Sequence, residues 1–120
     1  MNDVLKKLNL TLKDRRNKSP EKSYVASIYN KGLAHSCNKI EEESNELINA
    51  LKNESDERII SEAADLWFHC LVSLSMKNLS SDDILLELEK RIFNNIKIKY
   101  DPTLLDISSE IPLLSDITEI

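Results

Sequence analysis

The sequence has few of the residues that form tight turns, disulfide frameworks and β-sheets. Its 120 residues include one glycine, two cysteines and six aromatic side chains. A single glycine excludes a P-loop and a dinucleotide-binding fingerprint, each of which needs several glycines at fixed spacing. It also leaves almost no residue that takes a positive φ easily, as β-hairpin turns require. Taken together, Leu, Glu, Lys, Ala and Asn far outnumber the aromatic and β-branched residues that favour strands, and this composition favours helices.

Long apolar runs and an excess of positive charge are also missing. No stretch reaches eighteen consecutive apolar residues, and Met1–Lys7 lacks the apolar core of a secretory signal. The formal net charge of −5 argues against binding of nucleic acid through massed phosphate contacts. We therefore expect a single cytoplasmic domain without a membrane segment or a nucleic-acid partner.

The two cysteines, Cys37 and Cys70, lie far apart in the sequence and outside any CxxC pattern. Neither a zinc site nor a disulfide framework is therefore indicated. Because unpaired cysteines are among the residues most often buried, we expect both to lie in the core as small apolar side chains.

The spacing of apolar residues predicts an all-α fold, a helical bundle of four to five helices. A short helix around residues 4–12 leads into a basic loop at 15–23, and a second helix runs from Tyr24 to a stop at Gly32. The third, over 33–52, carries a stripe expected to face the core, formed by Leu33, Cys37, Ile40, Leu47 and Leu51.

The second half of the bundle is predicted to hold its centre. Ser55 or Asp56 is expected to cap a fourth helix, whose segment 63–74 is apolar nearly all round and so requires cover on most sides. We interpret it as the central helix of the core. A fifth amphipathic helix is expected to end near 94–95.

The last part of the chain differs in character, which predicts a domain at 1–97 and an extension at 98–120. No Lys or Arg follows Lys99. The whole negative excess comes from five acids of the extension, Asp101, Asp106, Glu110, Asp116 and Glu119. Its high apolar content leads us to expect that it packs on the body or on a partner chain.

Two pairs of carboxylates mark the third and fourth predicted helices. Glu43 and Glu46 are three residues apart, as are Glu62 and Asp65, so that each pair lies on one helix face. A short connector predicts an antiparallel hairpin that brings the pairs together. Asp65 shares its stripe with His69 and is expected to be desolvated, which is costly without a cation. Oxygen ligands alone favour Mg²⁺, with Mn²⁺ as a substitute.

Basic residues near these acids indicate a phosphate ligand. Arg15 and Arg16 lie in the basic loop, and Lys39 lies one helical turn before Glu43. Solvation of a surface loop is an equally good explanation of the two arginines. His69 fits a hydrogen-bonded core histidine better than a metal ligand.

Four segments together resemble the phosphoribosyl-ATP pyrophosphatase family, among the all-α, MazG-like nucleotide pyrophosphatases. The resemblance covers about residues 8–96. The paired acids alone indicate the superfamily, and the Ser-Tyr and Asp-Leu-x-x-His-x-Leu-Val patterns narrow it to this branch. The segments are Leu10–Arg16, Ser23–Ser27, Lys39–Glu46 and Glu62–Val72.

The resemblance implies Mg²⁺-dependent hydrolysis of phosphoribosyl-ATP to phosphoribosyl-AMP and pyrophosphate, the second step of histidine biosynthesis, by a homodimer. It implies the following roles for residues of this chain: Glu43, Glu46, Glu62 and Asp65 as metal ligands with Glu42 as a further candidate, Glu43 or Glu46 as the base, and Arg15, Arg16, Ser23, Tyr24 and Lys39 as substrate contacts. One departure is Glu41, which stands where the family usually has glycine.

Two other functions remain open from the sequence. One is a house-cleaning NTP pyrophosphatase of the same superfamily, which shares the paired acids. The other is a non-catalytic helical dimerisation module in which the acidic cluster is vestigial.

Overall fold

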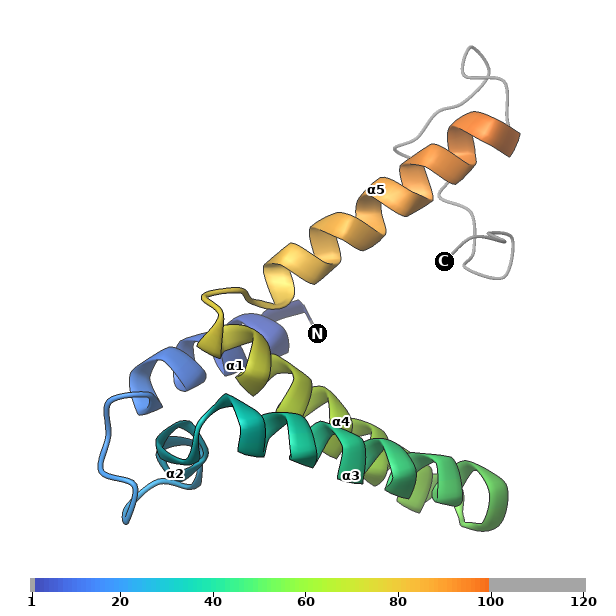
Figure 1. Ribbon diagram of the computed structural model, residues 1–120. Helices are drawn as coiled ribbons and strands as arrows, with labels where there is room; N and C mark the ends of the chain where they lie inside the picture. Colours follow the sequence, from blue (N-terminus) through green and yellow to red (C-terminus); the bar gives the residue numbers. More distant parts are fainter. Residues whose placement is uncertain (1, 100–120) are drawn as a thin grey trace. The chain divides into compact units, whose positions relative to one another are not determined.

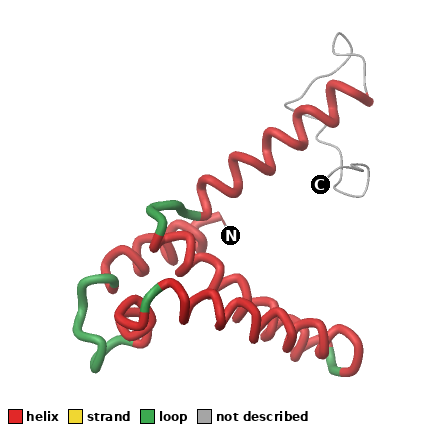
Figure 2. Tube along the Cα trace, viewed as in Figure 1, coloured by secondary structure: helices red, strands yellow, loops and turns green. Residues whose placement is uncertain are grey.

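Five α-helices follow one another along the described part of the chain (Figure 1). The computed structural model describes residues 2–99, and the side chains of residues 3–94. The helices are α1 (Asn2–Arg15), α2 (Tyr24–Lys31), α3 (Leu33–Asn53), α4 (Asp56–Met76) and α5 (Ser81–Lys99). Within residues 2–99 there is no strand, as the colouring of Figure 2 shows, and the all-α prediction is confirmed.

The ends of the helices follow from local chemistry. The Ser23 hydroxyl accepts a hydrogen bond from the Ala26 amide and caps α2, and Ser55 caps α4 in the same way through the Arg58 amide. Gly32 separates α2 from α3 with φ of +91°, a conformation that disfavours side chains with a Cβ. These residues explain why the boundaries between α2, α3 and α4 follow the predicted ones.

The structure divides into two compact units, one that ends at Ser81 and one that begins at Asp82. In the first, α3 and α4 form the predicted antiparallel hairpin, and α1 and α2 pack against α4 (Figure 1). The apolar core lies where α1 and α2 meet the second half of α4. Its buried residues are Leu12, Ile28, Leu71 and Val72.

The face of α3 that packs in the hairpin is not the predicted apolar stripe. Its buried residues are Ser36, Glu43 and Ala50, spaced by seven, whereas Leu33, Cys37 and Leu51 are exposed and Ile40 and Leu47 half-buried. The reason is that α4 opposes α3 with polar groups: the Ser36 and Ser73 hydroxyls lie 2.5 Å apart in a hydrogen bond. Small and polar side chains therefore fill this interface, and the apolar stripe is left outside it.

The predictions for α4 and the cysteines hold in part. Leu71 and Val72 are buried, but Trp67 is 64% and Ile60 68% exposed within a single chain. Cys70 is partly buried, which raises the pKa of its thiol, whereas Cys37 is exposed and the prediction that it is buried was wrong.

Among the described helices, α4 alone has the length and apolar composition needed to cross a membrane. Core helices of soluble proteins meet the same criterion. α4 packs against α1, α2 and α3, and 28% of its most apolar window is buried within the single chain.

α5 continues to Lys99, beyond the predicted end near 94–95. Two asparagines weaken a helix only modestly, and the next strong breaker in the sequence is Pro102. The predicted extension 98–120 lies almost wholly outside the described residues, and the boundary at 97 stays a prediction.

Candidate active site

Three of the predicted ligands meet between α3 and α4. One carboxylate oxygen each from Glu43, Glu62 and Asp65 lies within 4.8 Å of the others. The predicted hairpin and the spacing of three within Glu62–Asp65 produce this convergence. Glu46, one helical turn beyond Glu43, is near enough to change the pKa of both Glu43 and Glu62. Glu43, Glu62 and Asp65 therefore converge, and Glu46 beside them completes the carboxylate cluster.

Burial and crowding raise the pKa of two carboxylates of the cluster, Glu43 and Glu62. Desolvation is the main cause of the raised pKa of Glu43, and the charges of Asp65 and Glu62 add to it, while a hydrogen bond with Glu46 opposes it. Desolvation also raises the pKa of Glu62, helped by Glu46 and opposed by Arg58. The fold thus holds acids where their charged forms are disfavoured.

Carboxylate oxygens without hydrogen-bond partners indicate which ligand the cluster could bind. Oε2 of Glu43 and Oε2 of Glu62 are buried without a hydrogen-bond partner among the described residues. A buried carboxylate oxygen left unpaired is costly, and a divalent cation would satisfy both oxygens together. Because all the donors are carboxylate oxygens, they fit a hard ion such as Mg²⁺ or Mn²⁺.

The expected desolvation of Asp65 was wrong. Asp65 is exposed, whereas Glu43 and Glu62 are 8% and 4% exposed. The buried face of α4 continues through Glu62 and His69, seven residues apart, and Asp65 lies at the edge of that face. Its carboxylate joins the cluster from the solvent side.

Glu42, the further ligand candidate, is engaged by a different residue. Its Oε2 lies 3.2 Å from Nζ of Lys39 in an i,i+3 ion pair on the surface of α3. The hydrogen bond with Glu42 is the main cause of the raised pKa of Lys39. Glu42 is outside the three-residue convergence, although its charge is felt by Glu43.

Aromatic rings surround His69 at the edge of the cluster. The Tyr24 ring stacks on Phe68 and meets His69 edge-on, with ring centroids 6.3 and 6.5 Å apart. Burial and the charge of Lys39 lower the pKa of His69, and its Nδ1 has no hydrogen-bond partner among the described residues. His69 is a core histidine, as expected, but at Nδ1 the expected hydrogen bond is missing. Ser23 serves locally as the cap of α2.

Arg15, the last residue of α1, and Arg16, which follows it, contact groups other than the cluster carboxylates. Arg16 donates to the Ser75 carbonyl at 3.2 Å and lies over the Tyr29 ring. Ser75 is ten residues beyond Asp65, about 15 Å along the axis of α4. Arg16 lines a cavity of about 610 Å³ that also contains Lys18 and Lys77, whereas Arg15 pairs only loosely with Asp14 at 3.9 Å. The structure therefore does not bring Arg15 and Arg16 to the acids.

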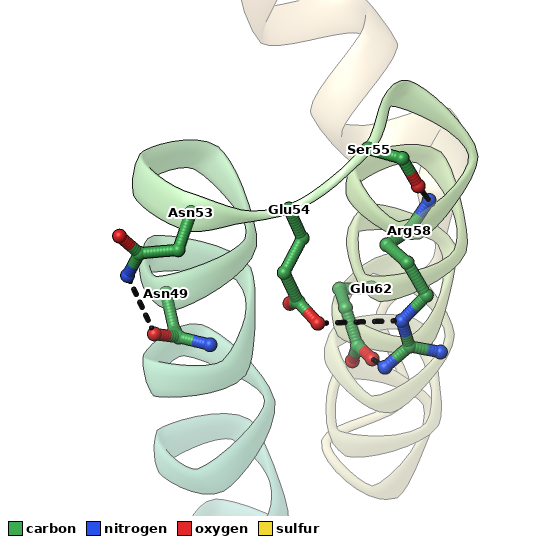
Figure 3. Close-up of polar contacts among 6 residues, drawn as sticks. All are labelled: Asn49, Asn53, Glu54, Ser55, Arg58 and Glu62. Atoms are coloured by element: carbon green, nitrogen blue, oxygen red, sulfur yellow. Dashed lines mark hydrogen bonds and ion pairs between the residues drawn. The ribbon is translucent and has the colours of Figure 1, made fainter.

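Arg58 is a cation at the cluster that sequence reasoning missed. Figure 3 shows its guanidinium between Glu54 and Glu62. Nη2 donates to Oε1 of Glu62 at 2.5 Å, and Nε lies 3.7 Å from Oε1 of Glu54. The spacing of four between Arg58 and Glu62 was the signal, since residues four apart are neighbours on a helix, whereas Glu54 reaches Arg58 from the C-cap of α3.

Comparison with known proteins identifies the family of the chain. A family model described as phosphoribosyl-ATP pyrophosphohydrolase matches residues 5–92. Proteins named phosphoribosyl-ATP pyrophosphatase from Hydrogenovibrio crunogenus and Methylococcus capsulatus are each 46% identical, over 75% and 74% of this chain and 83% and 85% of their own lengths. The protein of that name from Bordetella parapertussis is also 46% identical, over 74% of this chain and 80% of its own. The resemblance seen in the sequence is confirmed, and the chain belongs to the phosphoribosyl-ATP pyrophosphohydrolase family.

Proposed function

We propose that this protein hydrolyses phosphoribosyl-ATP to phosphoribosyl-AMP and pyrophosphate, in the second step of histidine biosynthesis in the cytoplasm. Its relatives carry the name phosphoribosyl-ATP pyrophosphatase, which supports this substrate. The observation that carries the proposal is the convergence of Glu43, Glu62 and Asp65 within 4.8 Å in a chain of this family. Membership in the family indicates the substrate, and the cluster supplies the chemistry.

We propose Glu43, Glu46, Glu62 and Asp65 as the residues that hold Mg²⁺, with Mn²⁺ as a substitute. Bound there, the ion would polarise phosphate oxygens and stabilise the charge on the leaving pyrophosphate. The unsatisfied oxygens of Glu43 and Glu62 support these two as ligands. Glu42 remains a weaker candidate because Lys39 engages its carboxylate.

The protein's own part in catalysis is to orient a water molecule and take its proton. Glu43 and Glu46 are the proposed bases. The attacking water gives its oxygen to phosphorus, the phosphoanhydride bond breaks, and pyrophosphate leaves.

Substrate contacts are proposed on the side of the cluster that faces α2. Tyr24 is half-exposed beside Phe68 and His69 and offers a ring against which a nucleobase can stack. Lys39 supplies a charge one turn from Glu43. Ser23, Arg15 and Arg16 remain proposed contacts from the resemblance, and the arginines require a substrate that reaches the far end of α4.

A homodimer is proposed from the apolar surface of the hairpin. Large side chains on both helices are exposed in the single chain: Ile48 and Leu51 on α3, and Ile60 and Trp67 on α4. Exposed apolar side chains gathered on neighbouring helices are typical of an interface. Trp67→Glu is expected to shift a dimer to monomer in sedimentation, whereas Leu10→Glu, at an exposed position of α1, serves as the matched control. A wild-type monomer at micromolar concentration would contradict the proposal.

The function is tested by pyrophosphate release from phosphoribosyl-ATP with and without Mg²⁺, beside canonical and modified NTPs. We expect turnover of phosphoribosyl-ATP that requires the metal and exceeds that of the other nucleotides. Preference for another NTP would indicate the house-cleaning activity, and absence of both turnover and Mg²⁺ binding would indicate the non-catalytic module.

A further inference from the structure

The carboxylate cluster has a cation of its own, Arg58. Its guanidinium, with the side chain 55% exposed, pairs with Glu62, whose side chain is 5% exposed, and reaches toward Glu54 (Figure 3). Arginine stays charged at every relevant pH and has five N–H donors. Two donor nitrogens, Nη2 and Nε, face these carboxylates, and N–H groups remain for another acceptor.

A cavity opens beside this pair. It has a volume of about 350 Å³, and the described residues that line it carry either carboxylates, amides or the guanidinium: Asn45, Glu46, Asn49, Glu54, Arg58 and Glu62. Two of these, Glu46 and Glu62, belong to the carboxylate cluster. The cavity therefore joins the place where a metal ion fits to the side chain best suited to grip phosphate oxygens.

The charges explain why Arg58 faces Glu62. Without a divalent ion, Arg58 compensates part of the negative charge of the cluster through its ion pair with Glu62. A metal ion at the cluster would take over that compensation, because Glu62 would then pair with a stronger local charge. The guanidinium, on a flexible and half-exposed side chain, would then be available to an anion in the cavity.

We propose that Arg58 is a phosphate-binding residue of the active site, which contacts the pyrophosphate portion of the substrate in the cavity at Asn45 and Asn49 and is held by Glu62 until a metal-bound phosphate displaces it. The inference rests on the proposed function for the identity of the anion. It assigns to Arg58 two effects of opposite sign: it strengthens binding of pyrophosphate and weakens binding of the free metal ion.

Because the two effects have opposite signs, measuring both affinities tests the inference. The experiment uses the full-length protein, with Mg²⁺ alone and with pyrophosphate in the presence of Mg²⁺ as probes. In Arg58→Gln, calorimetry should show pyrophosphate binding weakened about tenfold, as for the loss of one charge-assisted hydrogen bond. The same variant should bind Mg²⁺ several-fold more tightly, because the competitor for Glu62 is gone. Arg58→Lys, which keeps the charge without the planar fork, should fall between Gln and the wild type for pyrophosphate.

The matched control is Arg91→Gln on α5, which removes another arginine that pairs with a glutamate four residues earlier, Glu87, at 3.5 Å. It should change neither affinity. Circular dichroism confirms that the variants keep the wild-type helix content.

Unchanged pyrophosphate binding in Arg58→Gln would overturn the inference. Unchanged or weakened Mg²⁺ binding would also overturn it, since a merely structural arginine supports the metal site when present. Failure of the wild type to hydrolyse phosphoribosyl-ATP is a separate result. It contradicts the proposed function, while the pyrophosphate titration still decides the role of Arg58.

Discussion

The two halves of α4 pack against different kinds of interior. In the second half, Leu71 and Val72 join Leu12 and Ile28 in an apolar core. In the first half, Glu62 is equally buried but faces Glu43, and an oxygen of each is left without a partner. Apolar burial stabilises the fold, whereas buried and crowded carboxylates oppose it unless a cation is present. α4 therefore contributes both apolar contacts that stabilise the domain and a buried carboxylate of the proposed site, which destabilises it.

The largest effect on turnover is expected from substitutions that replace a metal-binding carboxylate by an amide of nearly the same shape. Glu43→Gln and Asp65→Asn should each lower turnover of phosphoribosyl-ATP by about a thousandfold or more, because each removes a proposed metal ligand, and Glu43→Gln also removes a proposed base. Initial rates of pyrophosphate release measure this, with helicity unchanged. Glu41→Gln, at an exposed position of the same helix, is the control. Metal-dependent activity retained in both variants would contradict the assignment of the site.

In the apolar core, substitutions should lower stability and not turnover. Leu12→Ala is expected to lower the free energy of unfolding by about 2–5 kcal/mol through lost burial and a cavity. Urea denaturation measures it. Leu10→Ala, on the exposed side of α1, should stay within about 0.5 kcal/mol of the wild type. An equal loss in both would mean that the core is not where Leu12 and Val72 meet.

The Ser23 cap gives a smaller effect. Ser23→Ala should cost about 1 kcal/mol and Ser23→Gly only a few tenths, because glycine tolerates the start of a helix. Thermal unfolding separates the two. The KM of the Gly variant then tests the proposed substrate contact, since its helix start is retained, and a KM equal to that of the wild type would leave Ser23 with the capping role alone.

The subtlest effect is the pH dependence of stability in the metal-free protein. Folding raises the pKa of Glu43 above its ordinary value of 4.5, so the folded state favours the protonated acid. Its contribution to stability is present below that value and is lost as the pH rises through the higher folded pKa. Glu43→Gln should therefore raise the Tm at pH 8, with a gain that shrinks toward pH 4.5. A gain independent of pH would exclude the charge as the cause.

Much of the fold was readable from the sequence because its signals are local. Gly32 and Ser55 mark helix ends through their own backbone chemistry, and the spacing of three in each acid pair fixes their common face. The helical hairpin follows from a connector too short for any other arrangement.

What escaped prediction depends on which face of one helix meets another. The apolar stripe of α3 suggested burial of Leu33 and Leu51, but the interface is formed by Ser36 and Glu43 because α4 presents polar groups there. Sequence periodicity detects an apolar face without identifying its partner. The exposed stripe fits the proposed dimer, in which a second chain would cover it.

The sequence also did not predict where two charged side chains lie relative to the cluster. Asp65 was expected to be buried and lies at the edge, while Arg58, in a pattern of ordinary surface pairs, lies at the cluster. Both outcomes depend on how α4 is rotated about its axis relative to α3. The pattern of residue types in the sequence does not fix that rotation.

The most direct measurement is the change in Tm on addition of Mg²⁺ to the wild type and to Glu43→Gln. If the buried carboxylates form a metal site, Mg²⁺ raises the Tm of the wild type by binding the folded state, and the variant, already relieved of the charge, responds far less. An equal rise in both proteins, or none in the wild type, would contradict the account.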